Sequence, residues 1–197
     1  MTHVVFDIGG VLVHGDPALI WSDELGPEGA EAFLARIGFD GLELACDGGA
    51  PLSDAVACVA DAEDGRRLSA YNACFAKSIP HKIEGSWEYL YALKRAGHPV
   101  SAITNWSAET WPIACDTYPE LASVFDTTIV SAAVGMVKPG LEIYRHFCAV
   151  ADVAAQDCLF IDDRAQNCVG AIAAGMDALH FSGPDALADG LQTRGLI

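Results

Sequence analysis

Polar residues follow four short apolar runs of this chain, at the points where those runs end. Asp7 comes directly after the first run, Thr104 ends the second, Lys138 follows the third after a short connection, and Asp162 and Asp163 come directly after the fourth. Singly, such residues often cap helices or lie in solvated turns. However, ligands of an open parallel sheet bind at the carboxyl ends of its strands. Four polar strand ends at one sheet edge therefore indicate a reaction site.

The chemistry that fits these side chains is phosphoryl transfer through a covalent intermediate. A carboxylate such as Asp7 can attack phosphorus, and water then hydrolyses the aspartyl phosphate. Because two anions repel one another, a cation must bridge them, and Mg²⁺ prefers carboxylate and phosphate oxygens as ligands. Asp7 with Asp162 or Asp163 supplies such oxygens. Thr104 and Lys138 would hold the phosphoryl oxygens and neutralise the charge of the transition state.

Two glycines, Gly9 and Gly10, follow Asp7 closely. Glycine tolerates backbone angles that are closed to other residues, and so allows a sharp turn. Such a turn can bring backbone N–H groups against a phosphate. The alternative explanation is a flexible bend without a ligand. We expect both glycines to contact the substrate.

The charge of the chain restricts its partners. The formal net charge is −16, which repels phosphate backbones and argues against nucleic acid and anionic membranes. The expected partner is instead a small phosphorylated metabolite. A chain this acidic needs local positive potential to bind phosphate, and Mg²⁺ and Lys138 would supply it. The sequence leaves open whether the protein is a monomer or a homodimer.

The remaining bulk features predict a cytoplasmic protein. Of the 197 residues, 52% are apolar, which is sufficient for a buried core, and no apolar stretch is long enough to span a membrane. The N-terminal residues show no signal-peptide pattern. The seven cysteines are scattered, odd in number and not paired in Cys-x-x-Cys motifs, which is typical of reduced thiols.

The element pattern predicts an α/β fold with a Rossmann-like, doubly wound parallel sheet. Five apolar runs without polar alternation predict buried strands at 3–6, 99–103, 127–130, 158–161 and 178–181. Helical patterns at 86–96, 141–150 and 165–174 alternate with them. In the last of these helices, Ala165, Cys168, Val169 and Ile172 form one apolar face.

One segment interrupts this alternation and predicts a small helical cap. Four helical stretches and no convincing strand occur between the first strand and the first core helix, at 18–25, 27–37, 51–62 and 65–77. We therefore predict a core of residues 1–14 and 81–197 and a cap of residues 15–80. Substrate identity would depend on the cap and neighbouring loops, where the larger side chains are Trp21, Arg36, Phe39, Trp106 and Trp111.

The motifs, taken in order, resemble those of the haloacid dehalogenase-like superfamily. They are Phe6-Asp7-Ile8-Gly9-Gly10-Val11-Leu12, Ile103-Thr104-Asn105, Lys138-Pro139, and Phe160-Ile161-Asp162-Asp163 with Asn167. Together they extend over almost the whole chain. The segments around Thr104, Lys138 and Asp162 look most similar to the bacterial α-D-glucose-1-phosphate phosphatase branch.

This resemblance implies specific roles. Asp7 would be the phosphorylated nucleophile in a Rossmann-like core below a small helical cap. Mg²⁺ would be held by Asp7, the backbone carbonyl of Gly9, Asp162 and Asp163. The phosphoryl group would be bound by Thr104, Asn105 and Lys138.

One position departs from the pattern of the family's phosphatases. They usually carry a second Asp two residues after the nucleophile, as general acid-base, and this chain has Gly9 there. Such a group is typically worth about 10²- to 10⁴-fold in rate. Three explanations are open: a substrate with a better leaving group, such as an anomeric phosphate; a substitute side chain, with His14 and Asp16 as candidates; or inefficient turnover.

Three functions are compatible with these features. The first is a Mg²⁺-dependent phosphatase acting on a small phosphorylated metabolite such as a sugar phosphate. The second is a 2-haloacid dehalogenase, which also lacks the second Asp, although the pair Asp162 and Asp163 would repel a haloacid carboxylate. The third is a weakly active or non-catalytic module that binds phosphate or is phosphorylated, which Gly9 supports.

Overall fold

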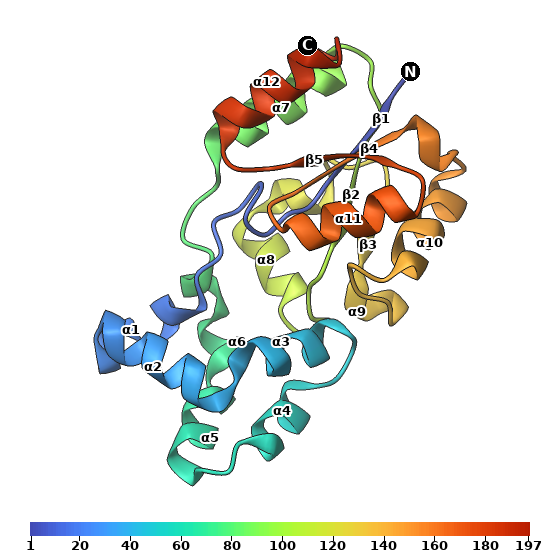
Figure 1. The fold of residues 1–197 in the computed structure, drawn as a ribbon. Helices are drawn as coiled ribbons and strands as arrows, with labels where there is room; N and C mark the ends of the chain where they lie inside the picture. The colour runs from blue at the N-terminus through green and yellow to red at the C-terminus, as the bar shows by residue number, and fades with distance from the viewer.

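A single five-stranded parallel sheet lies at the centre of the structure, a computed structural model that describes all residues from 1 to 197. The strand order is β3-β2-β1-β4-β5 (Figure 1). The strands are β1 (His3–Phe6), β2 (Val100–Thr104), β3 (Thr128–Val130), β4 (Cys158–Asp162) and β5 (Asp177–His180). All five predicted strands are confirmed, with ends shifted by one residue at most. The order places β1 in the middle, so that its carboxyl end adjoins those of β2 and β4.

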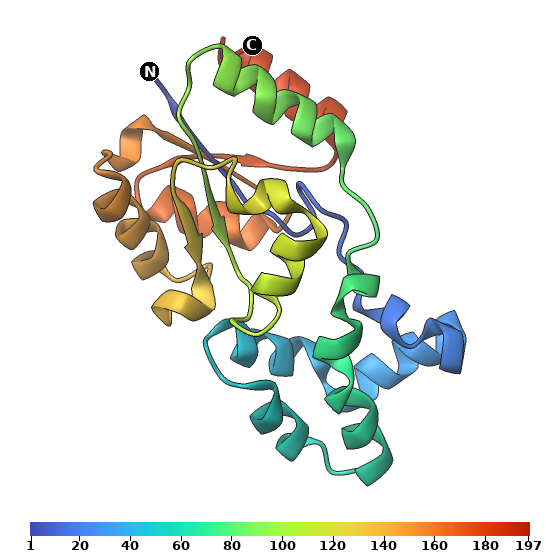
Figure 2. The ribbon, with the colours of Figure 1, turned by 180° about the vertical axis from the view of Figure 1, so that it is seen from behind.

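Helices cover both faces of the sheet, as the buried side chains of successive β1 residues show. Val4 and Phe6 share one core cluster with α7 (Glu84–Arg95) and α12 (Pro184–Thr193), which lie side by side (Figure 2). Val5 belongs to a second cluster, with residues of α10 (Leu141–Ala151) and α11 (Ala165–Ala173). Because both faces are buried, the strands need no polar alternation. The Rossmann-like, doubly wound prediction is confirmed.

The predicted apolar face of α11 is wrong in three of its four residues, since only Cys168 is buried. Val169 and Ile172 are 65% and 59% exposed. The helix instead buries Asn167 and Gly170. A Cβ at Gly170 would lie 2.5 Å from the carbonyl oxygen of Pro139, so only glycine permits this close approach. Polar contacts of Asn167, described below, thus prevail over the apolar pattern in orienting the helix.

Between β1 and α7 the regular elements are all helices, with no strand, as predicted, and they lie at the carboxyl edge of the sheet (Figure 1). Its elements are η1 (Pro17–Ile20), α1 (Ser22–Leu25), α2 (Pro27–Ile37), α3 (Phe39–Asp47), α4 (Leu52–Cys58), α5 (Ala62–Ser69), α6 (Tyr71–Cys74) and η2 (Phe75–Ser78). The predicted stretch 51–62 ends early, because Asp61 caps α5 through the backbone N–H groups of Glu63 and Asp64, both at 2.9 Å. Helix α3 was not predicted.

The helical insertion is connected to the sheet by two segments that run side by side. Ile83 N–H donates to the carbonyl of Leu12 at 2.9 Å, and His14 N–H donates to the carbonyl of His81 at 3.0 Å. The rings of His14 and His81 stack, with centroids 4.8 Å apart. These contacts fix the entry and exit of the insertion relative to β1. None of the helices is long and apolar enough to cross a membrane, and all seven cysteines are free thiols.

Candidate active site

The polar strand ends do converge, and a buried lysine joins two of them. β1 and β4 are adjacent, with Phe6 paired to Ile161, so the residues that follow, Asp7 and Asp162, lie side by side. The Nζ atom of Lys138 is 2.8 Å from Oδ2 of Asp7 and 2.7 Å from Oδ2 of Asp162. The Lys138 side chain is completely buried. The site therefore contains a desolvated ammonium group between two carboxylates.

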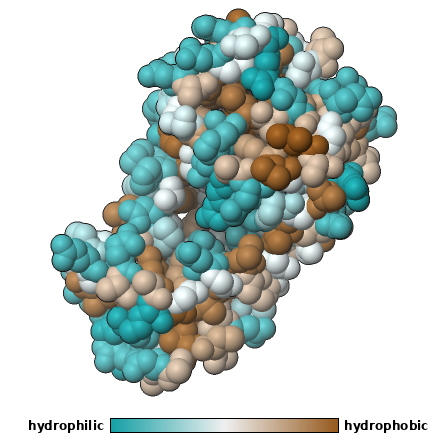
Figure 3. All heavy atoms as spheres, viewed as in Figure 1, coloured by the Kyte–Doolittle hydropathy of each residue, from teal (hydrophilic) through white to brown (hydrophobic).

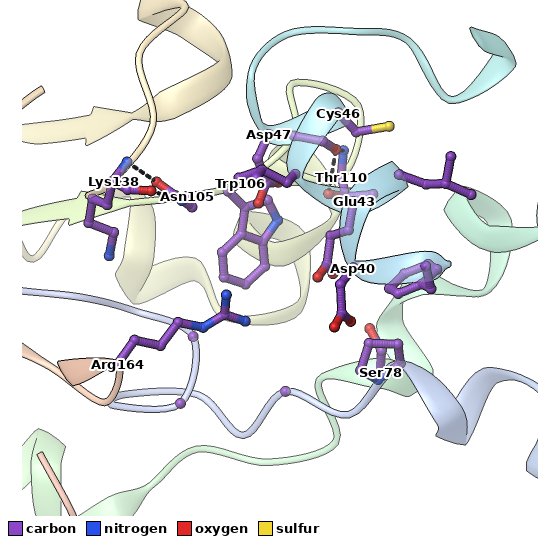
Figure 4. Close-up of a pocket in the computed structure, with 18 of the residues that line it drawn as sticks. Asp40, Glu43, Cys46, Asp47, Ser78, Asn105, Trp106, Thr110, Lys138 and Arg164 are labelled. Atoms are coloured by element: carbon purple, nitrogen blue, oxygen red, sulfur yellow. Dashed lines mark hydrogen bonds between the residues drawn. The ribbon is translucent and has the colours of Figure 1, made fainter. Parts of the chain in front are cut away.

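Asn105 holds the backbone of Lys138 in place. Its Oδ1 accepts a hydrogen bond from Lys138 N–H at 2.9 Å, and its Nδ2 donates to the Lys138 carbonyl at 3.1 Å (Figure 4). This two-point contact links the end of β2 to the loop after α9 (Ser131–Val134). The side chain of Asn105 thus positions Lys138. Its predicted contact with the phosphoryl group stays a prediction, and the side-chain amide retains one further N–H donor for such a contact.

Asp162 is saturated with hydrogen bonds. Besides Lys138, it accepts from Nδ2 of Asn167, at 3.0 Å to each oxygen, and from Arg164 N–H at 2.8 Å. A carboxylate has about four acceptor sites, and these hydrogen bonds occupy them, so Asp162 would exchange one of them for a bound cation. Asn167 belongs to the fourth motif, but its contact with both oxygens of Asp162 could not be predicted from the motif. Asp163, which is more exposed and makes no side-chain hydrogen bond, is the freer metal ligand of the pair.

The charges of the site suit a divalent cation. Asp7, Asp162 and Asp163 each offer a carboxylate oxygen, and these oxygens all lie within 4.8 Å of one another. Burial and the charge of Asp162 raise the pKa of Asp7, although Lys138 opposes this. Burial disfavours the Lys138 ammonium, but the two carboxylates outweigh it and raise its pKa. One ammonium thus faces three carboxylates, and oxygen-only ligands with excess negative charge favour Mg²⁺.

Mg²⁺ is expected to stabilise the fold. If the cation binds only the native state, a hundredfold excess over its Kd adds about 2.7 kcal/mol to the free energy of unfolding. Thermal unfolding with Mg²⁺ and with EDTA measures this effect. Asp163→Asn should weaken the Mg²⁺ affinity by at least about tenfold, whereas Asp116→Asn, on an exposed residue of α8 (Trp111–Thr117), should leave it unchanged. Equal melting temperatures with and without Mg²⁺ would contradict the prediction.

The Thr104 hydroxyl is a second sign of a ligand. Oγ1 of Thr104 is buried and has no hydrogen-bond partner within the chain. Buried hydroxyl groups are nearly always paired, so an unpaired one at a strand end calls for an explanation. An oxygen of a bound phosphoryl group would provide the missing partner. Thr104 ends β2, as the sequence predicted, but it is not among the cavity-lining residues, and its contact with substrate stays a prediction.

The loop after Asp7 turns back on itself. Leu12 N–H donates to the carbonyl of Ile8 at 2.8 Å, and Gly10 N–H donates to the carbonyl of Val13 at 2.8 Å. Gly10 has a φ of +75°, and a Cβ there would lie 2.5 Å from Oδ2 of Asp163. Glycine at position 10 is thus required by its backbone angle and by the neighbouring carboxylate.

Gly10→Ala is expected to destabilise the protein by about 1–3 kcal/mol, because it strains the backbone and displaces Asp163. Gly9→Ala is the matched control for stability. A Cβ at Gly9 would meet Cζ3 of Trp106 at 3.8 Å, an ordinary contact, and its backbone angle is open to other residues. Urea unfolding of both variants should show a clear loss for position 10 only. Equal stability of the two variants would contradict this account.

A cavity of about 730 Å³ opens above these residues, between the insertion and the sheet edge (Figure 4). Asp7, Lys138 and Asp163 line its base. Of the five large side chains predicted to set specificity, Phe39 and Trp106 line the cavity, whereas Trp21, Arg36 and Trp111 do not. Arg36 instead pairs with Asp64 at 2.8 Å, and Trp111 packs edge-on against Trp106. The hollow between the two parts is visible in Figure 3.

Helix α3 contributes three carboxylates to the cavity wall, Asp40, Glu43 and Asp47 (Figure 4). Their spacing of three and four residues places them on one helix face. Burial raises the pKa of Glu43, with Arg164 opposing it. Burial and the charge of Glu43 raise the pKa of Asp47 to about 7. Sequence reasoning missed these residues because it did not predict α3.

His14 and Asp16, the two side chains predicted to replace the missing acid-base, make other contacts. His14 is exposed, stacks on His81 and is not among the cavity-lining residues. Asp16 does line the cavity, but its Oδ1 accepts the backbone N–H of Ala18 at 3.0 Å and so caps η1. The His14 hypothesis is therefore wrong, because this side chain lies outside the cavity. Asp16 lies at the cavity, but one of its two oxygens is occupied by the cap.

A comparison with protein families decides the membership of the chain. A model described as haloacid dehalogenase-like hydrolase matches residues 1–175. The chain belongs to the haloacid dehalogenase-like hydrolases.

This hydrolase is similar to the sesquiterpene phosphatase astK of Aspergillus oryzae, with 35% identity over 108 residues, which is 55% of the chain. It is also similar to flavin mononucleotide hydrolase 1 of Arabidopsis thaliana, with 32% identity over 135 residues, which is 68% of the chain. The matched region covers 54% of each relative, so the chain spans about half their length.

Solved structures share the fold of this haloacid dehalogenase-like hydrolase. One is the HAD family enzyme bt-2542 of Bacteroides thetaiotaomicron in complex with magnesium and inorganic phosphate, with a TM-score of 0.73 and 19% identity, covering 93% of this chain and 95% of the other. Another is the L-2-haloacid dehalogenase RSc1362, with a TM-score of 0.66 and 18% identity, covering 92% and 86%. At these identities the likeness concerns the fold alone, and the chemistry depends on the site.

Proposed function

We propose that this hydrolase is a Mg²⁺-dependent phosphate monoester hydrolase that acts on a small phosphorylated metabolite through an aspartyl phosphate on Asp7. The observation that carries the proposal is the buried Lys138 bridge between Asp7 and Asp162, with Asp163 within metal-ligand reach. The similarity to a sesquiterpene phosphatase and a flavin mononucleotide hydrolase supports it.

Each residue has a role in this reaction. An oxygen of Asp7 attacks phosphorus, Lys138 and Thr104 bind the phosphoryl oxygens, and the backbone N–H of Gly9 approaches them from the loop. The predicted contact of Gly10 does not involve its N–H, which donates to the Val13 carbonyl at 2.8 Å. Asp7, the Gly9 carbonyl, Asp162 and Asp163 would hold Mg²⁺, with Asp163 as the freer carboxylate of the pair. When bound, the cation supplies positive charge that offsets repulsion between the carboxylates and the phosphate.

The proposed substrate class is a hydroxyl-rich phosphate ester such as a sugar phosphate. The cavity wall offers carboxylates that accept hydrogen bonds, such as Glu43 and Asp47, and the guanidinium group of Arg164 as a donor, whereas the Ser78 hydroxyl already donates to the Phe75 carbonyl at 2.7 Å. Sugar hydroxyl groups both donate and accept, which suits this mixture. The same carboxylates would repel a second anionic group on the substrate. The motif resemblance to the glucose-1-phosphate phosphatase branch agrees with this proposal.

We further propose that residues 15–80 act as a cap domain over a core of residues 1–14 and 81–197. Both parts line the cavity, and the two paired connecting segments join them. A cap of this kind would contact the organic part of the substrate, while the sheet edge contacts the phosphate.

Phosphate release from p-nitrophenyl phosphate, glucose 1-phosphate, glucose 6-phosphate and flavin mononucleotide, with Mg²⁺ and with EDTA, tests the proposal. Mg²⁺-dependent release that is highest for a sugar phosphate would support both the activity and the substrate class. A flat substrate profile would contradict the substrate class only.

Two other outcomes would favour the alternatives. Chloride release from 2-chloropropionate that EDTA does not affect would indicate a dehalogenase. Metal-dependent trapping of beryllofluoride without turnover would indicate a binding or regulatory module, which the missing acid at Gly9 would explain.

A further inference from the structure

The position of the missing acid-base is adjacent to a tryptophan. A Cβ at Gly9 would point toward Cζ3 of Trp106, 3.8 Å away. Trp106 is only 7% exposed and lines the cavity, and its Nε1 has no hydrogen-bond partner. An unpaired, buried indole N–H that borders a cavity indicates an acceptor on a bound molecule. The leaving-group side of the site is therefore the region around Trp106.

Helix α3 is anchored to the sheet edge at this same tryptophan. Ser131 Oγ accepts the backbone N–H of Trp106 at 2.9 Å and donates to the carbonyl of Asp47 at 2.6 Å. Ser131 is completely buried, so this contact fixes the C-terminal end of α3 beside Trp106. Asp40 and Glu43 lie seven and four residues further back, about 10 Å and 6 Å along the helix axis. Asp47 is thus the α3 carboxylate held at the core.

The Asp47 carboxylate is free for a ligand. It lines the same cavity as Asp7 and Lys138, and it makes no hydrogen bond or ion pair with another side chain. The neighbouring carboxylates differ. Glu43 accepts a weak hydrogen bond from Tyr71 at 3.4 Å, Asp16 caps η1, and Asp40 is exposed, at the end of α3 away from Ser131. Among these carboxylates, Asp47 combines a fixed backbone with an unengaged side chain.

We propose that Asp47 is the general acid-base of this hydrolase and replaces the aspartate that position 9 lacks. The proposal rests on the phosphatase activity proposed above. In the first step, an Asp7 oxygen bonds to phosphorus, the ester P–O bond breaks, and the leaving oxygen takes the proton of Asp47. In the second step, the Asp47 carboxylate takes a proton from water, the water oxygen bonds to phosphorus, and the bond from phosphorus to Asp7 breaks. The products are an alcohol and inorganic phosphate, and Asp47 is protonated again.

The electrostatic surroundings of Asp47 agree with this role. Burial and the charge of Glu43, on its own helix, raise the pKa of Asp47 to about 7. Arg164, from the loop after β4, and Lys138, from the loop after α9, lower it. A general acid-base works best when its pKa lies near the working pH, because both forms are then populated.

The test compares Asp47→Asn with the wild-type chain on two esters that differ in leaving group. The leaving group of glycerol phosphate is a strongly basic alkoxide that needs a proton. The leaving group of p-nitrophenyl phosphate is p-nitrophenolate, which is weakly basic. With glycerol phosphate, we expect kcat to fall by about 10²- to 10⁴-fold. With p-nitrophenyl phosphate, we expect a burst of p-nitrophenol stoichiometric with enzyme, followed by slow turnover, because phosphorylation proceeds but dephosphorylation lacks its base. The fall of kcat at alkaline pH that the wild type shows with glycerol phosphate should be absent in Asp47→Asn.

Several results would overturn the role of Asp47. One is wild-type turnover of both esters by Asp47→Asn, and another is a raised KM with unchanged kcat, which would indicate a binding contact only. Both leave the proposed phosphatase activity intact. A wild-type chain that releases no phosphate from either ester would overturn the activity and the role together.

Matched variants separate proton transfer from structural effects. Asp54→Asn makes the same charge change at an exposed residue of α4 outside the cavity, and should retain wild-type rates on both esters. Circular dichroism checks that Asp47→Asn is folded. Adding Gly9→Asp to Asp47→Asn should recover glycerol phosphate turnover by at least about tenfold, since a Cβ fits at position 9. Recovery of this kind would show that the lost function is proton transfer.

Discussion

Asp7→Asn is expected to abolish phosphate-ester hydrolysis, with a loss in kcat on the order of 10⁴- to 10⁶-fold. An amide oxygen cannot form the aspartyl phosphate, and no other carboxylate lies in the same position between Lys138 and the loop of Gly9 and Gly10. The measurement is phosphate release from p-nitrophenyl phosphate with Mg²⁺. Acid quenching of the wild-type reaction, followed by mass spectrometry, should detect a phosphoryl adduct on the peptide that contains Asp7, and the variant should show none.

The fold of Asp7→Asn should be intact, which makes the activity loss interpretable. Lys138 retains its contact with Asp162 at 2.7 Å, and asparagine has nearly the shape of aspartate. Because the change removes one of several like charges, thermal stability without Mg²⁺ should equal or exceed that of the wild type. Asp116→Asn, on the exposed side of α8, is the matched control and should remain active. Activity of Asp7→Asn within tenfold of the wild type would exclude an aspartyl phosphate on this residue.

The sequence was sufficient to predict the sheet and the residues at its carboxyl edge. Strands that are buried on both faces are continuous apolar runs, and a polar residue directly after such a run marks the strand end. Asp7, Thr104 and Asp162 were found by this rule, and the parallel arrangement then brought them together. These features are local in sequence, which is why they could be predicted from it.

Features that depend on contacts between distant segments were not predictable. Helix α3 contains Gly41 in its interior, which weakens a local helical pattern, and its end is fixed by Ser131, more than eighty residues away. The burial of Asn167 depends on Asp162 and on the glycine contact of α11 with Pro139. Nothing in the local pattern of α11 distinguishes this orientation from the one that buries Val169.

Lys138→Met is expected to destabilise the protein by about 3–5 kcal/mol, because it leaves two buried carboxylates without their counter-charge. Asp7 and Asp162 are both buried, and the Lys138 ammonium lies within 2.8 Å of each. Methionine preserves most of the side-chain volume, so the loss would reflect charge rather than a cavity. Urea unfolding in EDTA measures the effect. Hydrolysis should also fall, because the ammonium no longer binds the phosphoryl oxygens.

The comparison with Lys77→Met isolates the contribution of burial. Lys77 is also 3.0 Å from a carboxylate, that of Asp23, but both side chains are exposed and water screens their charges. Its replacement should have little measurable effect on stability. Mg²⁺ should restore part of the stability lost in Lys138→Met, since a cation bound by Asp7 and Asp163 would again offset the buried negative charge. If Lys138→Met were as stable as Lys77→Met in EDTA, the prediction would be wrong. The buried carboxylates would then be neutral in the folded chain, and the Lys138 ammonium would not contribute to its stability.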